Sequence, residues 1–313
     1  MQIGRRSLFF SSLMAPVIGF AADTQAADGA PAAGGILSLP NNRNILKGYA
    51  KSSIGQMHYR YVEPARDTGK PPLVFFHPNP FSGIYFNPSL VEFGKDRRAI
   101  AFDSPGYGES ARPDKPATME DVARIIGEAL DDMGYGKSGK KVDVTGFHTG
   151  AYIAPELAVQ RPDLVRRVVI SGVPFWEGKL REEKRAELLV DHPVTDDGAS
   201  IMSEWNRWAK RRPPGLSLER AYEIATSAMV AGPHIHWAYV GVINYNARPR
   251  FEKLEQPTLL LNPSGDALAV TTRLVLPLLK NGKLIERPDL PHQIYDLAVE
   301  ETGRTYREFL DAA

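Results

Sequence analysis

The sequence predicts an α/β protein in which helices flank a mainly parallel sheet and a helical cap is inserted late in the chain. Short, continuous apolar runs at 73–76 and 258–261 have the character of strands buried on both faces. Segments with helical spacing alternate with such runs, and this alternation implies right-handed crossovers in a parallel sheet. Residues 174–250 interrupt the alternation with helical, polar segments and no clear strand, which indicates the inserted cap.

Composition and charge narrow the class of protein. The chain has 313 residues, enough for one large core that carries an insertion. Its 43% hydrophobic and 24% charged residues are typical of globular proteins. A formal net charge of +1 gives no electrostatic basis for binding nucleic acid or an anionic membrane. The absence of cysteine excludes disulfides, thiolate metal ligands and a cysteine nucleophile.

The N-terminus is predicted to be a targeting signal. Arg5 and Arg6 precede a run of apolar and small residues, and residues 24–26 offer a small-x-Ala cleavage site. The paired arginines resemble a twin-arginine export signal, and the apolar run of about fifteen residues is shorter than the roughly twenty that span a bilayer. We expect a twin-arginine-type signal peptide at 1–26, a linker at 27–43, and a periplasmic or secreted protein without stable membrane insertion. An uncleaved anchor and a general secretory signal are the alternatives.

The elements of the sheet follow in order after the linker. Apolar or β-branched runs bounded by turn residues predict strands, and apolar residues at helical spacing predict helices. Strands are expected at 48–51, 56–63, 73–76, 98–102, from 142 onward, and at 164–170, 258–261 and 283–287. Helices are expected at 119–133, 151–160 and 302–310, and within the insertion at 179–189, 201–210 and 218–229. The predicted domains are a first core segment (44–173), a helical cap (174–250) and a second core segment (251–313).

The motif Gly146-Phe-His-Thr-Gly150 lies between a β-branched run and a helical segment. Strand, tight turn and helix are the geometry of a nucleophile elbow, which holds one side chain out at the top of a sheet. Glycines flank the turn because a Cβ there would crowd the bend. An elbow normally presents Ser, Asp or Cys, whereas this chain presents His148.

Four features make residues 44–313 resemble the α/β-hydrolase fold. His77-Pro-Asn-Pro80 is similar to the family's His-Gly-x-Pro loop, and residues 103–110 match its Asp-x-Pro-Gly-x-Gly-x-Ser turn. The elbow comes next, and Asp266 and His292 follow the last two expected strands. The resemblance implies hydrolysis without a cofactor, with a nucleophile, an acid and a histidine in this chain order.

The resemblance also implies roles for individual residues. Asp266 would hold His292 in one tautomer and stabilise its protonated form; Glu177 is a weaker candidate for the acid. In this fold the oxyanion hole uses the backbone N–H that follows the elbow residue, here Thr149, and one from the loop after the third strand. Because Pro78 and Pro80 lack an N–H, Asn79 is the expected second donor, with Phe81 as the fallback.

Three hypotheses remain open for His148. It can be a nucleophile that forms a labile acyl-imidazole, or a general base or polar clamp for water attack, elimination or C–C cleavage. The third hypothesis is a fold that has lost its catalytic serine and now binds a ligand. The ring of His148 is longer than a serine side chain and could contact His292, in which case the two imidazoles would titrate as a coupled pair.

The cap and the elbow also indicate the kind of substrate. Haloalkane dehalogenases and epoxide hydrolases would require an aspartate at position 148, so we expect instead a small, apolar ester, lactone or related carbonyl compound. Phe81, Phe147, Trp176 and Trp237 are candidate contacts for this substrate because aromatic side chains offer large amphipathic surfaces. No metal or other cofactor is expected, the alternative being a metal site that uses the His234-Ile-His236 pair, with or without His148 or His292. The sequence makes no prediction of the oligomeric state.

Overall fold

The computed structural model describes residues 44–136, 138–190 and 193–312. The predicted signal peptide (1–26) and linker (27–43) lie outside these residues. None of the helices in the described ranges combines the length and the apolar character needed to cross a membrane.

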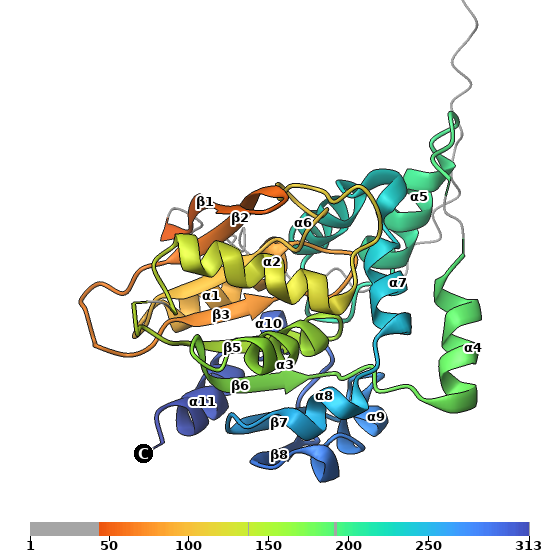
Figure 1. Ribbon diagram of the computed structural model, residues 1–313. Coiled ribbons are helices and arrows are strands. Elements are labelled where there is room, and N and C mark those ends of the chain that lie inside the picture. The colour runs from red at the N-terminus through yellow and green to blue at the C-terminus, as the bar shows by residue number, and fades with distance from the viewer. Residues whose placement is uncertain (1–43, 137, 191–192, 313) are drawn as a thin grey trace, which may run out of the picture. The chain divides into compact units, whose positions relative to one another are not determined.

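Within the described residues, an eight-stranded sheet has the order β1-β2-β4-β3-β5-β6-β7-β8 (Figure 1). The two pairings at the β1 edge are antiparallel and all the others are parallel, which confirms the predicted mainly parallel sheet. The strands are β1 (Leu46–Ser52), β2 (Gly55–Val62), β3 (Leu73–Phe76), β4 (Ala99–Phe102), β5 (Val142–Phe147), β6 (Val165–Ser171), β7 (Thr258–Pro263) and β8 (Gly282–Arg287).

Helices pack on both faces of this sheet, and a group of helices fills the range predicted to be the cap. The helices outside that range, or crossing its end in the case of α8, are α1 (Asn87–Phe93), α2 (Met119–Asp132), α3 (Gly150–Gln160), α8 (Arg248–Lys253), α9 (Ala269–Arg273), α10 (Ile294–Leu297) and α11 (Val299–Leu310), with the 3-10 turns η2 (Gly83–Phe86) and η5 (Leu276–Leu278). Those inside it are α4 (Gly178–Leu188), α5 (Ala199–Trp205), the π-helical η3 (Asn206–Lys210), α6 (Leu218–Met229), η4 (Gly232–His234) and α7 (Trp237–Asn244). Helix α8 spans the predicted boundary at residue 250.

The core lies on the two faces of the sheet, and alternate residues of each strand point to opposite faces. In β3, Val74 and Phe76 pack with α2, α3 and α8 on one face. Leu73 and Phe75 pack with α1, α11 and part of the cap on the other face. All four side chains are completely buried, as expected for a strand that is apolar at every position.

The elements that the sequence did not predict are short or lack a helical period. Helix α7 reads Trp-Ala-Tyr-Val-Gly-Val-Ile-Asn, which is apolar almost throughout and therefore has no amphipathic spacing to detect. Helices α9 and α10 have five and four residues, too few for a periodic pattern. Neither length nor amphipathic spacing therefore marks these segments as helices in the sequence.

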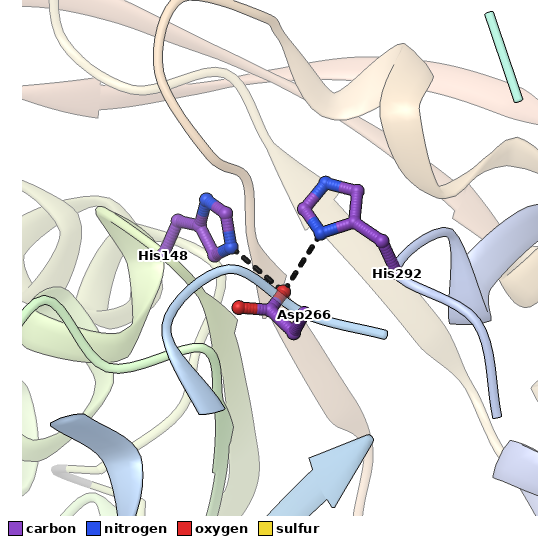
Figure 2. Close-up of side chains that lie close together, drawn as sticks. All are labelled: His148, Asp266 and His292. Carbon is purple, nitrogen blue, oxygen red and sulfur yellow. Dashed lines mark hydrogen bonds and ion pairs between the residues drawn. The ribbon is translucent and has the colours of Figure 1, made fainter. Parts of the chain in front are cut away.

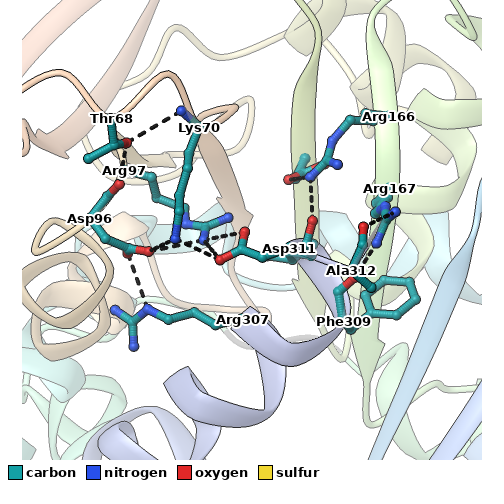
Figure 3. A network of polar contacts seen from close by, with 12 residues as sticks. Thr68, Lys70, Asp96, Arg97, Arg166, Arg167, Arg307, Phe309, Asp311 and Ala312 are labelled. Carbon is teal, nitrogen blue, oxygen red and sulfur yellow. Dashed lines mark hydrogen bonds and ion pairs between the residues drawn. The ribbon is translucent and has the colours of Figure 1, made fainter.

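A network of charged side chains fastens the C-terminal end of α11 to the sheet (Figure 3). The Asp311 carboxylate accepts hydrogen bonds from the buried Arg97 at 2.7 and 2.8 Å and from Lys70 at 2.7 Å. Arg166 and Arg167 donate to backbone carbonyls at the end of the helix, including a 2.7 Å bond from Arg166 to the carbonyl of Leu310. These bonds hold the C-terminal end of α11 in place. Helix α11 follows His292 and α10 in the chain.

Candidate active site

The elbow predicted from the sequence is present at the carboxyl end of β5, between β3 and β6 in the sheet. His148 has φ 50°, and among the described residues it is the one non-glycine residue with positive φ. A Cβ on Gly146 would lie 1.9 Å from the carbonyl oxygen of Gly150, and one on Gly150 would lie 1.9 Å from that of Phe76. The two glycines are therefore a steric requirement of the turn.

The structure brings His148, Asp266 and His292 together at the carboxyl ends of β5, β7 and β8 (Figure 2). One oxygen of Asp266, Oδ2, lies 2.9 Å from Nε2 of His148 and 2.9 Å from Nδ1 of His292. The other oxygen, Oδ1, accepts the backbone N–H of Leu268 at 2.7 Å. Asp266 therefore lies between the two imidazoles and orients both of them.

The rings of His148 and His292 lie close to each other, as the sequence analysis allowed, and Asp266 connects them. The ring centroids of His148 and His292 lie 5.2 Å apart, and no hydrogen bond between described residues joins the imidazoles directly. Because an ionised carboxylate only accepts hydrogen bonds, each histidine is assigned its proton on the nitrogen that faces Asp266. Nδ1 of His148 and Nε2 of His292 are then the basic nitrogens, and both point away from Asp266 (Figure 2).

Asp266 is held in its ionised form. Burial by itself would raise the pKa of its carboxyl group, but the hydrogen bonds from His148 and His292 outweigh burial and lower that pKa well below its usual range. The Asp266 side chain is fully buried, whereas those of His148 and His292 are 25% and 38% exposed. The site thus has a buried anion beneath two accessible imidazoles.

Gly172, which follows β6, makes room for the His148 ring. A Cβ at this position would lie 2.3 Å from Cδ2 and 2.7 Å from Nε2 of His148, both far inside van der Waals contact. Gly172 has φ +62°, a conformation that L side chains rarely adopt. The neighbouring strand is therefore shaped to accept a side chain larger than serine at the elbow.

The structure also brings the two predicted oxyanion donors together. The backbone N–H of Asn79 donates to the hydroxyl of Thr149 at 3.3 Å, so that N–H already has a partner. The fallback donor, Phe81, uses its N–H in a turn to the carbonyl of Pro78 at 3.1 Å. No described group accepts the backbone N–H of Thr149, which is the donor most available to a substrate.

A cavity of about 130 Å³ lies over the two imidazoles. An engineered apolar cavity of about 150 Å³ holds one benzene molecule, so this space suits a small molecule or one arm of a larger one. Buried oxygen atoms of Asn79 (Oδ1) and Gln293 (Oε1) have no partner among the described residues and can accept hydrogen bonds from a ligand or water. The lining comprises Pro78, Asn79, Phe81, Tyr85, Phe147, His148, Trp208, Leu216, Ala221, Ile224, Tyr239, His292 and Gln293.

Two of the four predicted substrate contacts line this cavity and two do not. Phe81 and Phe147 are in the lining, whereas Trp237 lines a smaller cavity of about 20 Å³ together with Thr149 and with Asn79, which lines both cavities. Trp176 lines neither of these cavities and packs against the core, with Lys184 over its ring. The cap tryptophan that reaches the larger cavity is Trp208, whose ring meets Phe81 edge-on at 4.8 Å.

The remaining candidates have other surroundings. Glu177, the alternative acid, forms an exposed ion pair with Arg248. His234 of the alternative metal pair lies against Trp237, with ring centroids 4.3 Å apart. Within the described residues, the three donor side chains close enough to share a metal ion are those of His148, Asp266 and His292, whose ligand atoms all lie within 4.8 Å of one another.

The sequence is similar to a known protein family and to characterised enzymes. The model of a family described as "Alpha/beta hydrolase family" matches residues 73–307. Over 220 residues the chain is 24% identical to a poly(3-hydroxyalkanoate) depolymerase of Ectopseudomonas oleovorans, which covers 65% of this chain and 74% of the depolymerase. Over 143 residues it is 32% identical to haloalkane dehalogenase 2 of Mycobacterium bovis, which covers 45% of this chain and 47% of the dehalogenase, about half of its length.

Solved structures agree with this assignment at the level of the fold. The enol-lactonase of Burkholderia xenovorans LB400 is similar with a TM-score of 0.65 and 18% sequence identity, over 85% of this chain and 100% of the enol-lactonase. At this identity the similarity extends to the fold alone.

Proposed function

The chain belongs to the alpha/beta hydrolase family, and we propose that it hydrolyses an ester, lactone or related carbonyl bond of a small apolar molecule by activating water between His148 and His292. One observation carries the proposal: both imidazoles are oriented by a single buried carboxylate, which leaves a basic nitrogen on each ring. In the proposed reaction, a water molecule donates one hydrogen bond to Nδ1 of His148 and one to Nε2 of His292.

The reaction then proceeds without a covalent enzyme intermediate. The water oxygen attacks the carbonyl carbon, and one imidazole takes the proton that the water loses. Asp266 stabilises the imidazolium that forms, as the acid of a triad does. The N–H of Thr149 stabilises the oxyanion. As the intermediate collapses, the imidazolium returns the proton to the leaving oxygen.

Geometry favours water activation over direct attack by His148. Nε2, the less hindered ring nitrogen, is bonded to Asp266. Nδ1 remains, and it is adjacent to the ring carbon that carries Cβ, so an acyl group on it would crowd the elbow backbone at φ 50°. A general base only accepts a proton on Nδ1, so water activation needs no space for an acyl group at that nitrogen.

The depolymerase supports an ester as the substrate. Its name denotes an enzyme that cleaves a polymer of hydroxyalkanoates. The apolar lining from Phe81, Phe147 and Trp208 suits an apolar acyl or ring substituent next to the reacting carbonyl.

A panel of short-chain esters and lactones tests the proposal. We expect wild-type turnover, a fall in kcat of at least about 100-fold in His148→Ala and in His292→Ala, and no change in the control His234→Ala. If the wild type turns over no substrate and activity arises only in His148→Ser, the proposed role of His148 is wrong for these substrates.

Intact-mass measurement during turnover separates water activation from nucleophilic attack. With a slowly hydrolysed activated ester and acid quenching, the proposal predicts an unmodified protein mass at every time point. An acyl adduct that maps to His148 and decays at the rate of turnover would instead establish His148 as the nucleophile.

A further inference from the structure

We propose that His148, Asp266 and His292 bind a divalent first-row transition metal ion, with Zn²⁺ and Co²⁺ as the ions that test it. Two imidazoles and one carboxylate form a donor set that zinc sites use, together with a water in the open position. The proposal concerns binding alone and goes beyond the proposed hydrolytic function, so it holds or fails whether or not the protein cleaves esters.

The distances between the donors are close to those around an ion. Donors about 2.1 Å from a common metal lie about 3.0 Å apart when their bonds meet at a right angle, and about 3.4 Å apart in a tetrahedron. Oδ2 of Asp266 lies 2.9 Å from the facing nitrogen of each histidine. The carboxylate–imidazole pairs therefore need only a small expansion to admit an ion.

The two histidine nitrogens complete the site by approaching each other. All three donor atoms lie within 4.8 Å of one another, and nitrogens bound to one ion are at most about 4.2 Å apart. The side chains of His148 and His292 are 25% and 38% exposed, so neither ring is fully enclosed, and His292 is the more exposed of the two. Asp266 stays in place because its second oxygen accepts the N–H of Leu268.

The metal would replace two protons. The nitrogens that face Asp266 are protonated in the hydrogen-bonded arrangement, and each must lose its proton before it can donate a lone pair to a metal. The carboxylate charge that holds these protons would equally stabilise a divalent cation in their place. Serine at position 148 would leave only one imidazole beside Asp266, so the site depends on the histidine at the elbow.

The open coordination position would face the cavity over the two imidazoles. His148 and His292 both line it, and Oε1 of Gln293 in the same lining has no partner among the described residues. This oxygen can accept a hydrogen bond from a metal-bound water.

Metal titration of the full-length protein, stripped of metal with a chelator and then dialysed, tests the inference. Calorimetry with Zn²⁺ measures stoichiometry and affinity, and the visible absorption of Co²⁺ reports nitrogen and oxygen ligation. We expect one ion per chain. We expect the affinity to fall by about 100-fold or more in His148→Ala, Asp266→Asn and His292→Ala, since each loses one of three protein ligands.

Two further variants make the outcome decisive. His148→Ser carries a residue that elbows normally hold, so it is expected to fold, as judged by its thermal unfolding, and to lose metal binding. The double variant His234→Ala/His236→Ala removes the cap histidines and should bind Zn²⁺ as the wild type does. No one-to-one binding, binding retained in both His148→Ser and His292→Ala, or binding lost in the cap variant would each overturn the proposal.

Discussion

His148 occupies the left-handed backbone region at φ 50°, where a residue with a Cβ is strained by roughly 1–3 kcal/mol. The folded protein tolerates this backbone strain at a position whose side chain, a histidine, is much larger than serine. Asp266 bonds the ring from one side, and Gly172 leaves the space that the ring fills. His148 thus has both a bonded partner and a space that its ring fills, and these surroundings favour a working residue over decay.

Asp266→Asn tests whether the shared carboxylate orients the two imidazoles. Asparagine keeps the shape of the side chain but loses its charge, and its NH2 group would have to face either the two imidazole N–H groups or the N–H of Leu268. If the protein turns over an ester, we expect kcat to fall roughly 1,000-fold with the fold intact, because one or both histidines would adopt the wrong tautomer. Steady-state kinetics with near-ultraviolet circular dichroism as a check would measure this, and an unchanged kcat would limit Asp266 to a structural role.

Gly172→Ala tests the fit between the His148 ring and its neighbour. The added Cβ would overlap the ring in a backbone conformation with φ +62°, and we expect the free energy of unfolding to drop by about 2–4 kcal/mol. In the His148→Ala background the overlap is gone, and the same change should cost only about 1–2 kcal/mol. Urea unfolding of the wild type, the two single variants and the double variant gives the coupling energy between the two substitutions. If their effects on the free energy of unfolding are additive, the His148 ring does not occupy the space beside Gly172.

The cap contributes side chains to the cavity that its sequence did not distinguish. Trp176, Trp208 and Trp237 have the same chemistry, and all three lie in the predicted cap range. Only the packing of η3 against Phe81 directs Trp208 to the cavity over the imidazoles. Because the cap helices pack on one another as well as on the sheet, residue spacing alone could not say which aromatic rings face inward.

Trp208→Ala and Trp176→Ala form a matched pair that tests this assignment. Removing Trp208 opens the cavity wall and removes apolar contact, so we expect KM for an apolar ester to rise about 10-fold. Removing Trp176, which lines neither cavity, should leave KM unchanged while lowering stability. Michaelis constants for two esters that differ in acyl length measure the contrast, and equal effects of the two substitutions would contradict it.

The ion-pair network at the end of α11 makes stability depend on pH (Figure 3). Burial alone would raise the pKa of Asp96, but bonds from Lys70 and Arg97 and the charge of Arg307 lower it from 3.8 to about 2. A carboxyl group whose pKa is lower in the folded state stabilises the fold above its unfolded pKa, and that contribution is lost as the pH falls through its folded value. The contribution of Asp96 is therefore complete above about pH 5 and declines between about pH 4 and pH 2.

Asp96→Asn should remove this contribution. We expect the variant to be less stable than the wild type by about 1–2 kcal/mol at pH 6, and we expect the difference to shrink as the pH falls from 4 toward 2. Thermal unfolding of both proteins from pH 6 to pH 2.5 measures it. A stability difference that is constant across this range would show that Asp96 contributes through packing rather than through its charge.

At the scale of the whole molecule, the features that the sequence predicted are those that depend on chain order and hydrophobic patterning. The apolar runs and their alternation with helices predicted the parallel sheet, and the positions of Asp266 and His292 after its last strands predicted that both would reach the elbow. The placement of Asp266 between the two rings was not predictable, because it depends on side-chain orientation. The partner of the Asn79 N–H depends on the Thr149 rotamer in the same way.

On the basis of the N-terminal sequence alone, we propose that the protein is exported by the twin-arginine route. When the full chain is expressed in a bacterium with this route, we expect the exported protein to lack roughly the first 26 residues by intact mass. Replacing Arg5 and Arg6 together by lysine conserves the positive charge that a general secretory signal needs and removes the arginine pair. Full-length protein retained in the cytoplasm by this double variant would support the twin-arginine route, whereas normal export and cleavage would assign the signal to the general secretory route.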